Sequence, residues 1–228
     1  MIYRSYSALV FDCDGVVLNS NTIKAEAFRR VTLPFGEPAS SALVNFHTQN
    51  GGVSRYAKFQ HFVDSILPTH APDVIVGDRS AFLHSLLARF ATEVKAGLLQ
   101  CEVASGLMEL RQAMHDTSWL IVCGGDQAEL REVFEQRDLA QYFDGGIYGS
   151  PKDKHSIVAD LLEAGEIQRP ALFLGDSRLD HEVAKTFGLD FVFVYHWTEF
   201  TDWLEYCRMN AITVIPSVSD LIQNMSAY

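Results

Sequence analysis

Two short apolar runs, far apart in the chain, both end in carboxylates. The first run, residues 8–11, leads into Asp12 and Asp14, and the second, residues 171–174, leads through a glycine into Asp176. Apolar runs of this length are typical of buried strands in a parallel sheet. Ligands of open α/β sheets bind outside the carboxyl ends of the strands. We therefore expect a parallel sheet with a carboxylate site at one edge.

A regular alternation of helix and strand patterns begins at about residue 103. Strands are expected at 118–123, 145–148, 171–174, 190–195 and 212–215, and helices at 105–115, 126–136, 152–164 and 178–187, with a last helix begun by Ser217 or Ser219. Such alternation is typical of a parallel sheet covered by helices. The expected fold is α/β, a Rossmann-like parallel sheet with helices on both faces.

The segment between the first strand and this region has a different pattern. Its apolar residues follow helical spacing, and amphipathic helices are expected at 19–30, 53–66 and 79–95, with no convincing strand between them. We therefore expect an all-α cap domain, residues 17–99, inserted into a Rossmann-like core made of residues 1–16 and 100–228.

The composition excludes several classes of protein. The 228 residues carry a formal net charge of −11 with no basic stripe, which argues against nucleic acid as a partner. No apolar run approaches the roughly 18 residues of a membrane helix. The four cysteines show no paired spacing, which favours a reduced, cytoplasmic compartment. The sequence leaves the oligomeric state open.

Asp12 and Asp14 are separated by one residue, so in an extended strand their side chains point the same way. Neighbouring carboxylates repel each other, and a fold accepts that cost for a bound cation or for acid–base chemistry. An aspartate-rich turn closed by Gly15 would give the same residues. Asp176 and Asp180 favour a cation site, although they could instead cap and begin the next helix. Ligands that are all oxygen suit Mg²⁺ better than zinc.

Four segments, in order along the chain, resemble the motifs of the haloacid dehalogenase (HAD) superfamily. They are Asp12-Cys13-Asp14-Gly15-Val16, the strand end Cys123-Gly124-Gly125, the segment Gly149-Ser150-Pro151-Lys152-Asp153-Lys154, and Gly175-Asp176-Ser177-Arg178-Leu179-Asp180. The first and fourth segments are specific, and the other two gain weight from their order and spacing. The helical insertion resembles the helical-cap branch, which includes phosphatases and β-phosphoglucomutase-like enzymes.

The resemblance implies phosphoryl transfer through an aspartyl-phosphate. Asp12 would be the nucleophile, and Asp14 would act as acid and then as base, which requires a raised pKa. Mg²⁺ would be held by Asp12, Asp176 and the backbone carbonyl of Asp14, with Asp180 as a further ligand or support. An aspartate at position 14 favours phosphate chemistry over the cleavage of carbon–halogen bonds.

The resemblance also calls for a lysine that contacts the phosphate and Asp12, and two lysines compete for this role. Lys154 stands three residues before Ile157, the first inward position of the expected helix, and is therefore favoured over Lys152. For either residue the alternative is a solvated surface lysine.

Cys123 stands where the family places a hydroxyl that binds a phosphoryl oxygen. A thiol is a poorer donor, so the backbone amides of Gly124 and Gly125 could carry this contact instead. A slower enzyme, or a noncatalytic protein on the same fold, are both compatible with this replacement.

In the cap, Arg55 and Lys58 lie three residues apart on one face of an expected helix, after two glycines. We expect them to contact an anionic or polyhydroxyl leaving group, and a solvated charged face is the alternative. Four histidines show no ligand spacing and are interpreted as ordinary cap residues: His47, His61, His70 and His84.

The sequence therefore predicts a Mg²⁺-dependent phosphatase that acts on a small phosphorylated metabolite. A β-phosphoglucomutase-like phosphomutase, or a binding or regulatory protein with weak catalysis, are the alternatives. The fold does not choose among small phosphate esters, so the substrate itself is not predicted.

Overall fold

The computed structural model describes residues 6–221, and its centre is a six-stranded sheet in the order β3-β2-β1-β4-β5-β6. Every neighbouring pair of strands is parallel. The strands are β1 (Ala8–Phe11), β2 (Ser118–Asp126), β3 (Gly146–Ser150), β4 (Ala171–Gly175), β5 (Asp190–Val194) and β6 (Thr213–Ile215). The expected parallel α/β fold is confirmed, and it places the ends of β1 and β4 side by side at the centre of the sheet.

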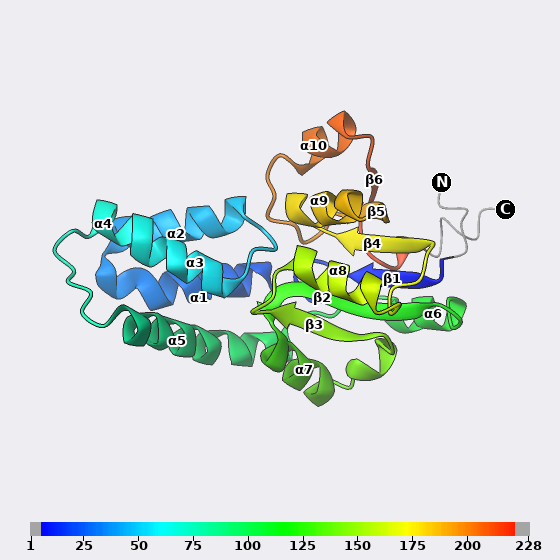
Figure 1. Ribbon diagram of the computed structural model, residues 1–228, viewed down its shortest axis with the longest axis horizontal. Coiled ribbons are helices and arrows are strands. Elements are labelled where there is room, and N and C mark those ends of the chain that lie inside the picture. The colour runs from blue at the N-terminus through cyan, green and yellow to red at the C-terminus, as the bar shows by residue number, and fades with distance from the viewer. Residues whose placement is uncertain (1–5, 222–228) are drawn as a thin grey trace.

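Helices cover both faces of the sheet, as Figure 1 shows. One face packs against α8 (Lys154–Glu163) and α9 (Arg178–Thr186), and the other packs against α6 (Leu107–Ala113) and α7 (Gln127–Gln136). The alternation of strand β1 explains this arrangement, because Ala8 and Val10 face the first layer while Leu9 and Phe11 face the second. All four side chains are fully buried.

The helices between β1 and β2 form a separate bundle beyond the carboxyl ends of the strands (Figure 1). We call this bundle the cap; its helices are α1 (Asn21–Thr32), the 3₁₀ turn η1 (Leu33–Phe35), α2 (Glu37–Gln49), α3 (Arg55–His61), the π-helical turn η2 (Phe62–Ile66), α4 (Leu67–His70) and α5 (Arg79–Gln100). The sequence predicts most of these helices. It misses η1, α2 and α4, and it joins α3 and η2 into one helix.

Two segments of chain connect the cap to the sheet, and they run side by side. The amide of Asn19 donates to the carbonyl of Glu102 at 2.9 Å, and the amide of Ala104 donates to the carbonyl of Val17 at 2.9 Å. These bonds give the cap a two-stranded attachment that begins directly after the first motif. The division into residues 17–99 and the remaining core remains a prediction, and its boundaries fall close to this attachment.

The region after β5 also differs from the prediction. Helix α10 (Trp203–Met209) lies between two expected strands, where the sequence analysis expects no helix, and the ring of Trp203 stacks on Tyr195 and Phe193. The expected last helix is described only for its beginning at Asp220 and Leu221, and the rest of it lies outside the described residues. Within residues 6–221, no helix is both long enough and apolar enough to cross a bilayer.

Candidate active site

The first motif follows β1 directly, and the sheet fixes its start. The amide of Asp12 continues the ladder to β4 by donating to the carbonyl of Leu174 at 2.9 Å. The Asp12 carboxylate is 2 % exposed. Its Oδ1 accepts a hydrogen bond from the amide of Cys13 at 2.7 Å, and its Oδ2 lies 2.8 Å from the Lys154 ammonium. Burial raises the pKa of Asp12, and the nearby charge of Lys154 opposes that rise. A buried carboxylate beside a lysine is suited to act as a nucleophile toward phosphorus.

Lys154 is the first residue of α8, and its side chain reaches Asp12 at the end of β1. Its Nζ lies 2.8 Å from Asp12 Oδ2 and 2.5 Å from Asp180 Oδ1. Burial alone would lower the pKa of Lys154, but the charges of Asp12 and Asp180 outweigh it and hold this pKa well above its usual range. The competing Lys152 does not reach the site, because its exposed ammonium pairs with Asp160. Of the two candidate lysines, the structure brings only Lys154 to Asp12.

The fourth motif supplies two more carboxylates. Asp12, Asp176 and Asp180 each offer an oxygen, and these oxygens all lie within 4.8 Å of one another. Burial first, and then the charges of Asp12 and Asp180, raise the pKa of Asp176 well above its usual range. The three residues present only oxygen ligands in a crowded, buried cluster, which fits a hard divalent cation such as Mg²⁺.

Asp180 is less available to a metal than Asp12 and Asp176. Its Oδ1 contacts Lys154, while its Oδ2 accepts bonds from the Ser177 hydroxyl at 2.6 Å and the Ser177 amide at 3.1 Å. The Ser177–Asp180 pair forms a capping box at the start of α9. Asp180 therefore holds Lys154 and the helix start in place, which favours the supporting role among the two that the sequence leaves open.

Gly15 lets the first and fourth motifs approach closely. It has a positive φ of 77°, and a Cβ there would lie 2.1 Å from Asp176 Oδ2. Because a side chain would displace the Asp176 carboxylate, only glycine fits this turn. The backbone next to Asp14 is thereby kept against Asp176, where the predicted metal ligand, the Asp14 carbonyl, is required.

Three groups hold the Asp14 carboxylate. It pairs with Lys24, accepts a bond from the Ser20 hydroxyl at 2.6 Å, and accepts the Cys123 thiol at 3.3 Å. Burial alone would raise the pKa of Asp14, but the charge of Lys24 and these hydrogen bonds lower it below its usual range. The expectation of a raised pKa for Asp14 is therefore wrong for this arrangement, in which Asp14 is ionised.

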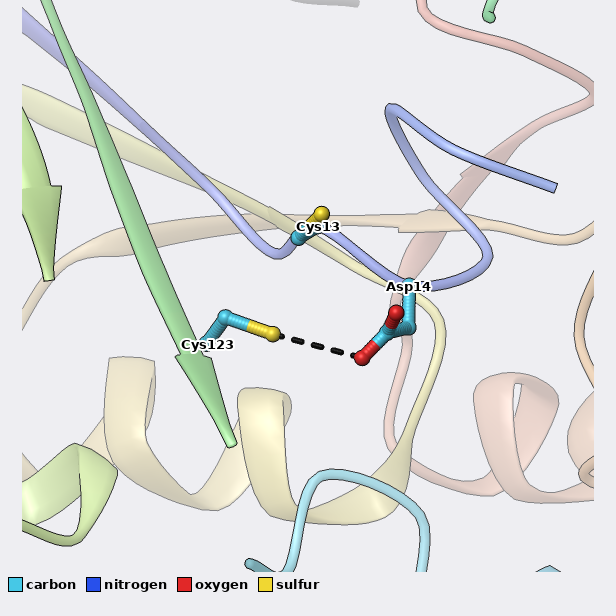
Figure 2. Close-up of side chains that lie close together, drawn as sticks. All are labelled: Cys13, Asp14 and Cys123. Carbon is cyan, nitrogen blue, oxygen red and sulfur yellow. Dashed lines mark hydrogen bonds between the residues drawn. The ribbon is translucent and has the colours of Figure 1, made fainter. Parts of the chain in front are cut away.

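Cys123 lies on β2 and points at Asp14, as Figure 2 shows. Its sulfur also accepts the amide of Gly125 at 3.2 Å. Cys13 lies close by, with its sulfur within 4.8 Å of the Cys123 sulfur and an Asp14 oxygen. The thiol is therefore oriented toward Asp14 by a polar contact and is not packed only against apolar side chains.

Gly124 and Gly125 line the cavity beside Cys123, and each approaches part of the cap. A Cβ at Gly124 would lie 2.1 Å from the carbonyl oxygen of Gly52, and a Cβ at Gly125 would lie 3.3 Å from Lys24 Nζ. Because neither glycine has a side chain, the cap can pack closely against the end of β2.

The cap and the sheet edge enclose a cavity of about 60 Å³. Asp12, Asp14 and Asp176 line its floor from the sheet side. The cap contributes the residues Lys24, Phe28, His47, Arg55, Lys58 and Phe90. A carboxylate cluster therefore faces a wall that contains several cations.

The two predicted cap residues, Arg55 and Lys58, both line this cavity, but their surroundings differ. Arg55 pairs with Glu129 of α7, with one contact at 3.0 Å, and its guanidinium lies 4.7 Å from the centre of the Phe90 ring. The Lys58 ammonium lies 2.7 Å from His47 Nδ1. Neither residue lies on a solvated face, since Arg55 is 6 % and Lys58 2 % exposed.

Sequence reasoning missed several residues of the site. Ser20, Asn21 and Lys24 all follow the first motif closely, and Asn21 donates to Asp176 Oδ2 at 2.9 Å. Their closeness in the chain to Asp14 was an available signal. His47 and Glu199 gave no such signal, because they come from a helix and a loop that meet only in the folded chain.

The comparisons with known proteins agree with this geometry. Residues 9–194 match the model of the family described as haloacid dehalogenase-like hydrolase. This match spans most of the chain and includes all four motifs, so the chain belongs to that family. A search of curated proteins found no match.

Solved structures share the whole fold at low sequence identity. A predicted phosphoglycolate phosphatase from Haemophilus somnus 129PT has a TM-score of 0.76 at 14 % identity, covering 98 % of this chain and 99 % of its own. A predicted phosphatase from Clostridium acetobutylicum has a TM-score of 0.72 at 18 % identity, covering 96 % and 98 %. A hydrolase from Pseudomonas syringae has a TM-score of 0.71 at 16 % identity, covering 96 % and 97 %. At these identities the likeness establishes the arrangement of core and cap.

Proposed function

We propose that the protein is a Mg²⁺-dependent phosphatase that hydrolyses a small phosphomonoester through an aspartyl-phosphate. The observation that carries this proposal is the buried Asp12 carboxylate, which lies 2.8 Å from the Lys154 ammonium and within 4.8 Å of oxygens of Asp176 and Asp180. Membership of the hydrolase family and the phosphatase names of two similar structures support it.

In the first step, an Asp12 oxygen attacks phosphorus and forms a P–O bond, while the bond from phosphorus to the ester oxygen breaks. The leaving oxygen takes a proton from Asp14 and departs as an alcohol. In the second step, water attacks the same phosphorus, Asp14 takes its proton, and the bond to Asp12 breaks. The two steps together consume one water, release inorganic phosphate and restore both carboxylates.

The contacts of Asp14 bear on both steps. Its pairing with Lys24 favours the ionised form, which the second step requires because Asp14 must then accept a proton. For the first step Asp14 must carry a proton, so entry of the ester has to weaken the Lys24 contact. With the Lys24–Asp14 pair in place, the unliganded site therefore has Asp14 in the form that the second step requires.

Lys154 and the backbone at Gly124 and Gly125 would bind the phosphoryl oxygens. Asp12, Asp176 and the Asp14 carbonyl would hold a divalent cation, which offsets negative charge on the phosphoryl group. Asp180 would keep Lys154 aligned.

The test is hydrolysis of p-nitrophenyl phosphate with Mg²⁺ by the wild type and by Asp12→Asn. We expect the variant to lose the activity, since an amide cannot form the acyl phosphate. Asp116→Asn is the matched control, because the Asp116 side chain is 92 % exposed and lies outside the cavity. Equal activity of wild type and Asp12→Asn would remove the proposed function.

A further inference from the structure

The buried cations in and beside the cavity are not equally paired. Lys24 has Asp14 as its counter-ion, Arg55 has Glu129, and Lys154 has both Asp12 and Asp180. Lys58 is as deeply buried as these residues, with an exposed fraction of 2 %. Among residues 6–221, however, no carboxylate oxygen lies within 4.0 Å of its ammonium. A buried cation without a counter-ion costs free energy, so this exception requires an explanation.

Among residues 6–221, the polar partner of Lys58 is His47. Lys58 Nζ lies 2.7 Å from His47 Nδ1. An ammonium group has only donors, so Nδ1 must accept this bond, and the proton of the neutral ring is then on Nε2. His47 Nε2 is enclosed and has no hydrogen-bond partner among the described residues, with the Glu199 carboxylate 4.0 Å away. Lys58 therefore keeps unused N–H groups at the cap side of the cavity, and His47 holds it there.

Glu199, in the loop after β5, is the acidic residue that faces this pair. Its Oε2 lies 4.0 Å from His47 Nε2, which is too long for a hydrogen bond. Glu199 approaches Nε2, on the side of the His47 ring away from Lys58. It therefore accepts none of the remaining N–H groups of Lys58. Glu199 side-chain exposure is 27 %, which places this carboxylate nearer the rim than Lys58.

We propose that Lys58, held by its contact with His47, binds a carboxylate on the leaving group, so that the substrate is a small phosphorylated carboxylic acid. This inference rests on the proposed phosphatase function, whose phosphoryl group would lie at Asp12 on the floor of the same cavity. The ammonium supplies the positive charge and the donors, and a carboxylate supplies the negative charge and the acceptor oxygens.

Two other leaving groups fit less well. A neutral hydroxyl would use the donors but would leave the charge of Lys58 uncompensated in a buried site. A second phosphate would bring about two negative charges to one unpaired cation. A carboxylate matches the single charge of Lys58.

The experiment compares two esters of similar size, phosphoglycolate and 2-hydroxyethyl phosphate, which differ in a carboxylate against a hydroxymethyl group. We expect the wild type to prefer phosphoglycolate. In Lys58→Met, we expect kcat/KM for phosphoglycolate to fall by about 10- to 100-fold, mainly through KM, as for the loss of a hydrogen bond to a charge. For 2-hydroxyethyl phosphate the value should stay within about threefold.

The matched control is Lys185→Met, because Lys185 is an exposed lysine in the last turn of α9 and does not line the cavity. It should change neither ester. His47→Phe is a second variant that keeps an aromatic ring but removes the nitrogen that accepts from Lys58, and it should also lower the preference for phosphoglycolate. Thermal unfolding of each variant establishes that it is folded before its rates are compared.

Equal loss on both esters in Lys58→Met, or no preference in the wild type, would overturn the inference. Preference for an ester with a second phosphate, such as 1,3-propanediol bisphosphate, would overturn the choice of a carboxylate. Failure of the phosphatase proposal itself would look different, because p-nitrophenyl phosphate hydrolysis would then not depend on Asp12.

Discussion

The two ends of the cavity are built in different ways. On the sheet side, each charged group lies within a few residues of a strand end or a helix start, and each is paired with an opposite charge or hydrogen-bonded. On the cap side, Lys58 and His47 come from separate helices and leave donors unused. On the sheet side the charged groups thus have partners within the protein, whereas on the cap side Lys58 has donors left for a ligand. Under the proposals above, the common chemistry belongs to one end and the choice of substrate to the other.

The largest effect should come from breaking the pairing on the sheet side. Lys154→Met leaves Asp12 and Asp180 close together without their shared cation. We expect activity toward p-nitrophenyl phosphate to fall by about 100- to 1,000-fold, as for loss of a charge-stabilising donor. Removing one partner of a buried pair should also lower the free energy of unfolding by about 3–5 kcal/mol, measured by denaturant titration.

Lys152→Met is the comparison for that variant, since the two lysines are two residues apart and both have acidic partners. Lys152 is exposed and pairs only with Asp160 at the surface. We expect a change in unfolding free energy of less than about 1 kcal/mol and activity close to that of the wild type. Equal losses in both variants would contradict the assignment of Lys154.

The next largest effect on activity should come from disturbing the contact between Gly124 at the end of β2 and Gly52 in the cap. In Gly124→Ala the added methyl group would meet the carbonyl of Gly52, which belongs to the cap. Overpacking of this kind costs about 1–3 kcal/mol, so we expect kcat/KM to fall by about 10-fold or more while the sheet remains folded by circular dichroism. Gly77→Ala is the matched control, because nothing lies within 4 Å of its Cβ. A normal rate in Gly124→Ala would show that the closed arrangement is not needed for turnover.

A smaller effect should follow from restoring a hydroxyl at Cys123. The thiol is a weak donor to Asp14, and a serine would donate more strongly to Asp14 or to a phosphoryl oxygen. We expect Cys123→Ser to raise kcat/KM for p-nitrophenyl phosphate by about 3- to 10-fold, in line with one improved hydrogen bond. Cys101→Ser, outside the cavity, is the control and should leave the rate unchanged. A lower rate in Cys123→Ser would mean that the thiol has a function that a hydroxyl cannot replace.

A separate effect concerns the stability of the unliganded cap. Burial lowers the pKa of Lys58 to about 7, and the charge of Lys24 adds to this. A lysine whose folded pKa is below its unfolded value destabilises the fold fully below pH 7, and this cost disappears as the pH rises toward the unfolded value of about 10.4. Lys58→Met should therefore raise the melting temperature more at pH 6 than at pH 9. Lys185→Met should show no such difference, and a pH-independent effect of Lys58→Met would contradict the account.

The sequence predicts the sheet side well for a physical reason. Asp12, Asp14 and Asp176 directly follow apolar strands, and parallel strands bring their carboxyl ends to one edge. Helix periodicity also separates Lys154 from Lys152, because only an inward position reaches the strand ends. Local patterns therefore define positions that the sheet then holds next to one another.

The cap side could not be predicted in the same way. His47 lies on α2, a helix that the sequence analysis missed, and its contact with Lys58 depends on how two helices pack. The pKa of Asp14 was predicted to be raised, but Lys24, in the first turn of α1, lowers it. The pairing of Arg55 with Glu129 joins the cap to α7 and likewise has no signature in the sequence.

The two side-by-side crossings at residues 17–19 and 102–104 mark the boundary between the groups that hold Asp14 and those that hold Asp12. Ser20 and Lys24 stand on the cap side of this boundary, whereas Asp12 and its partner Lys154 stand on the sheet side. The negative charge of Asp14 is therefore stabilised across the boundary, while that of Asp12 is stabilised within the sheet side alone. A change in how the cap packs on the sheet would alter the proton affinity of Asp14 without touching the contact between Asp12 and Lys154.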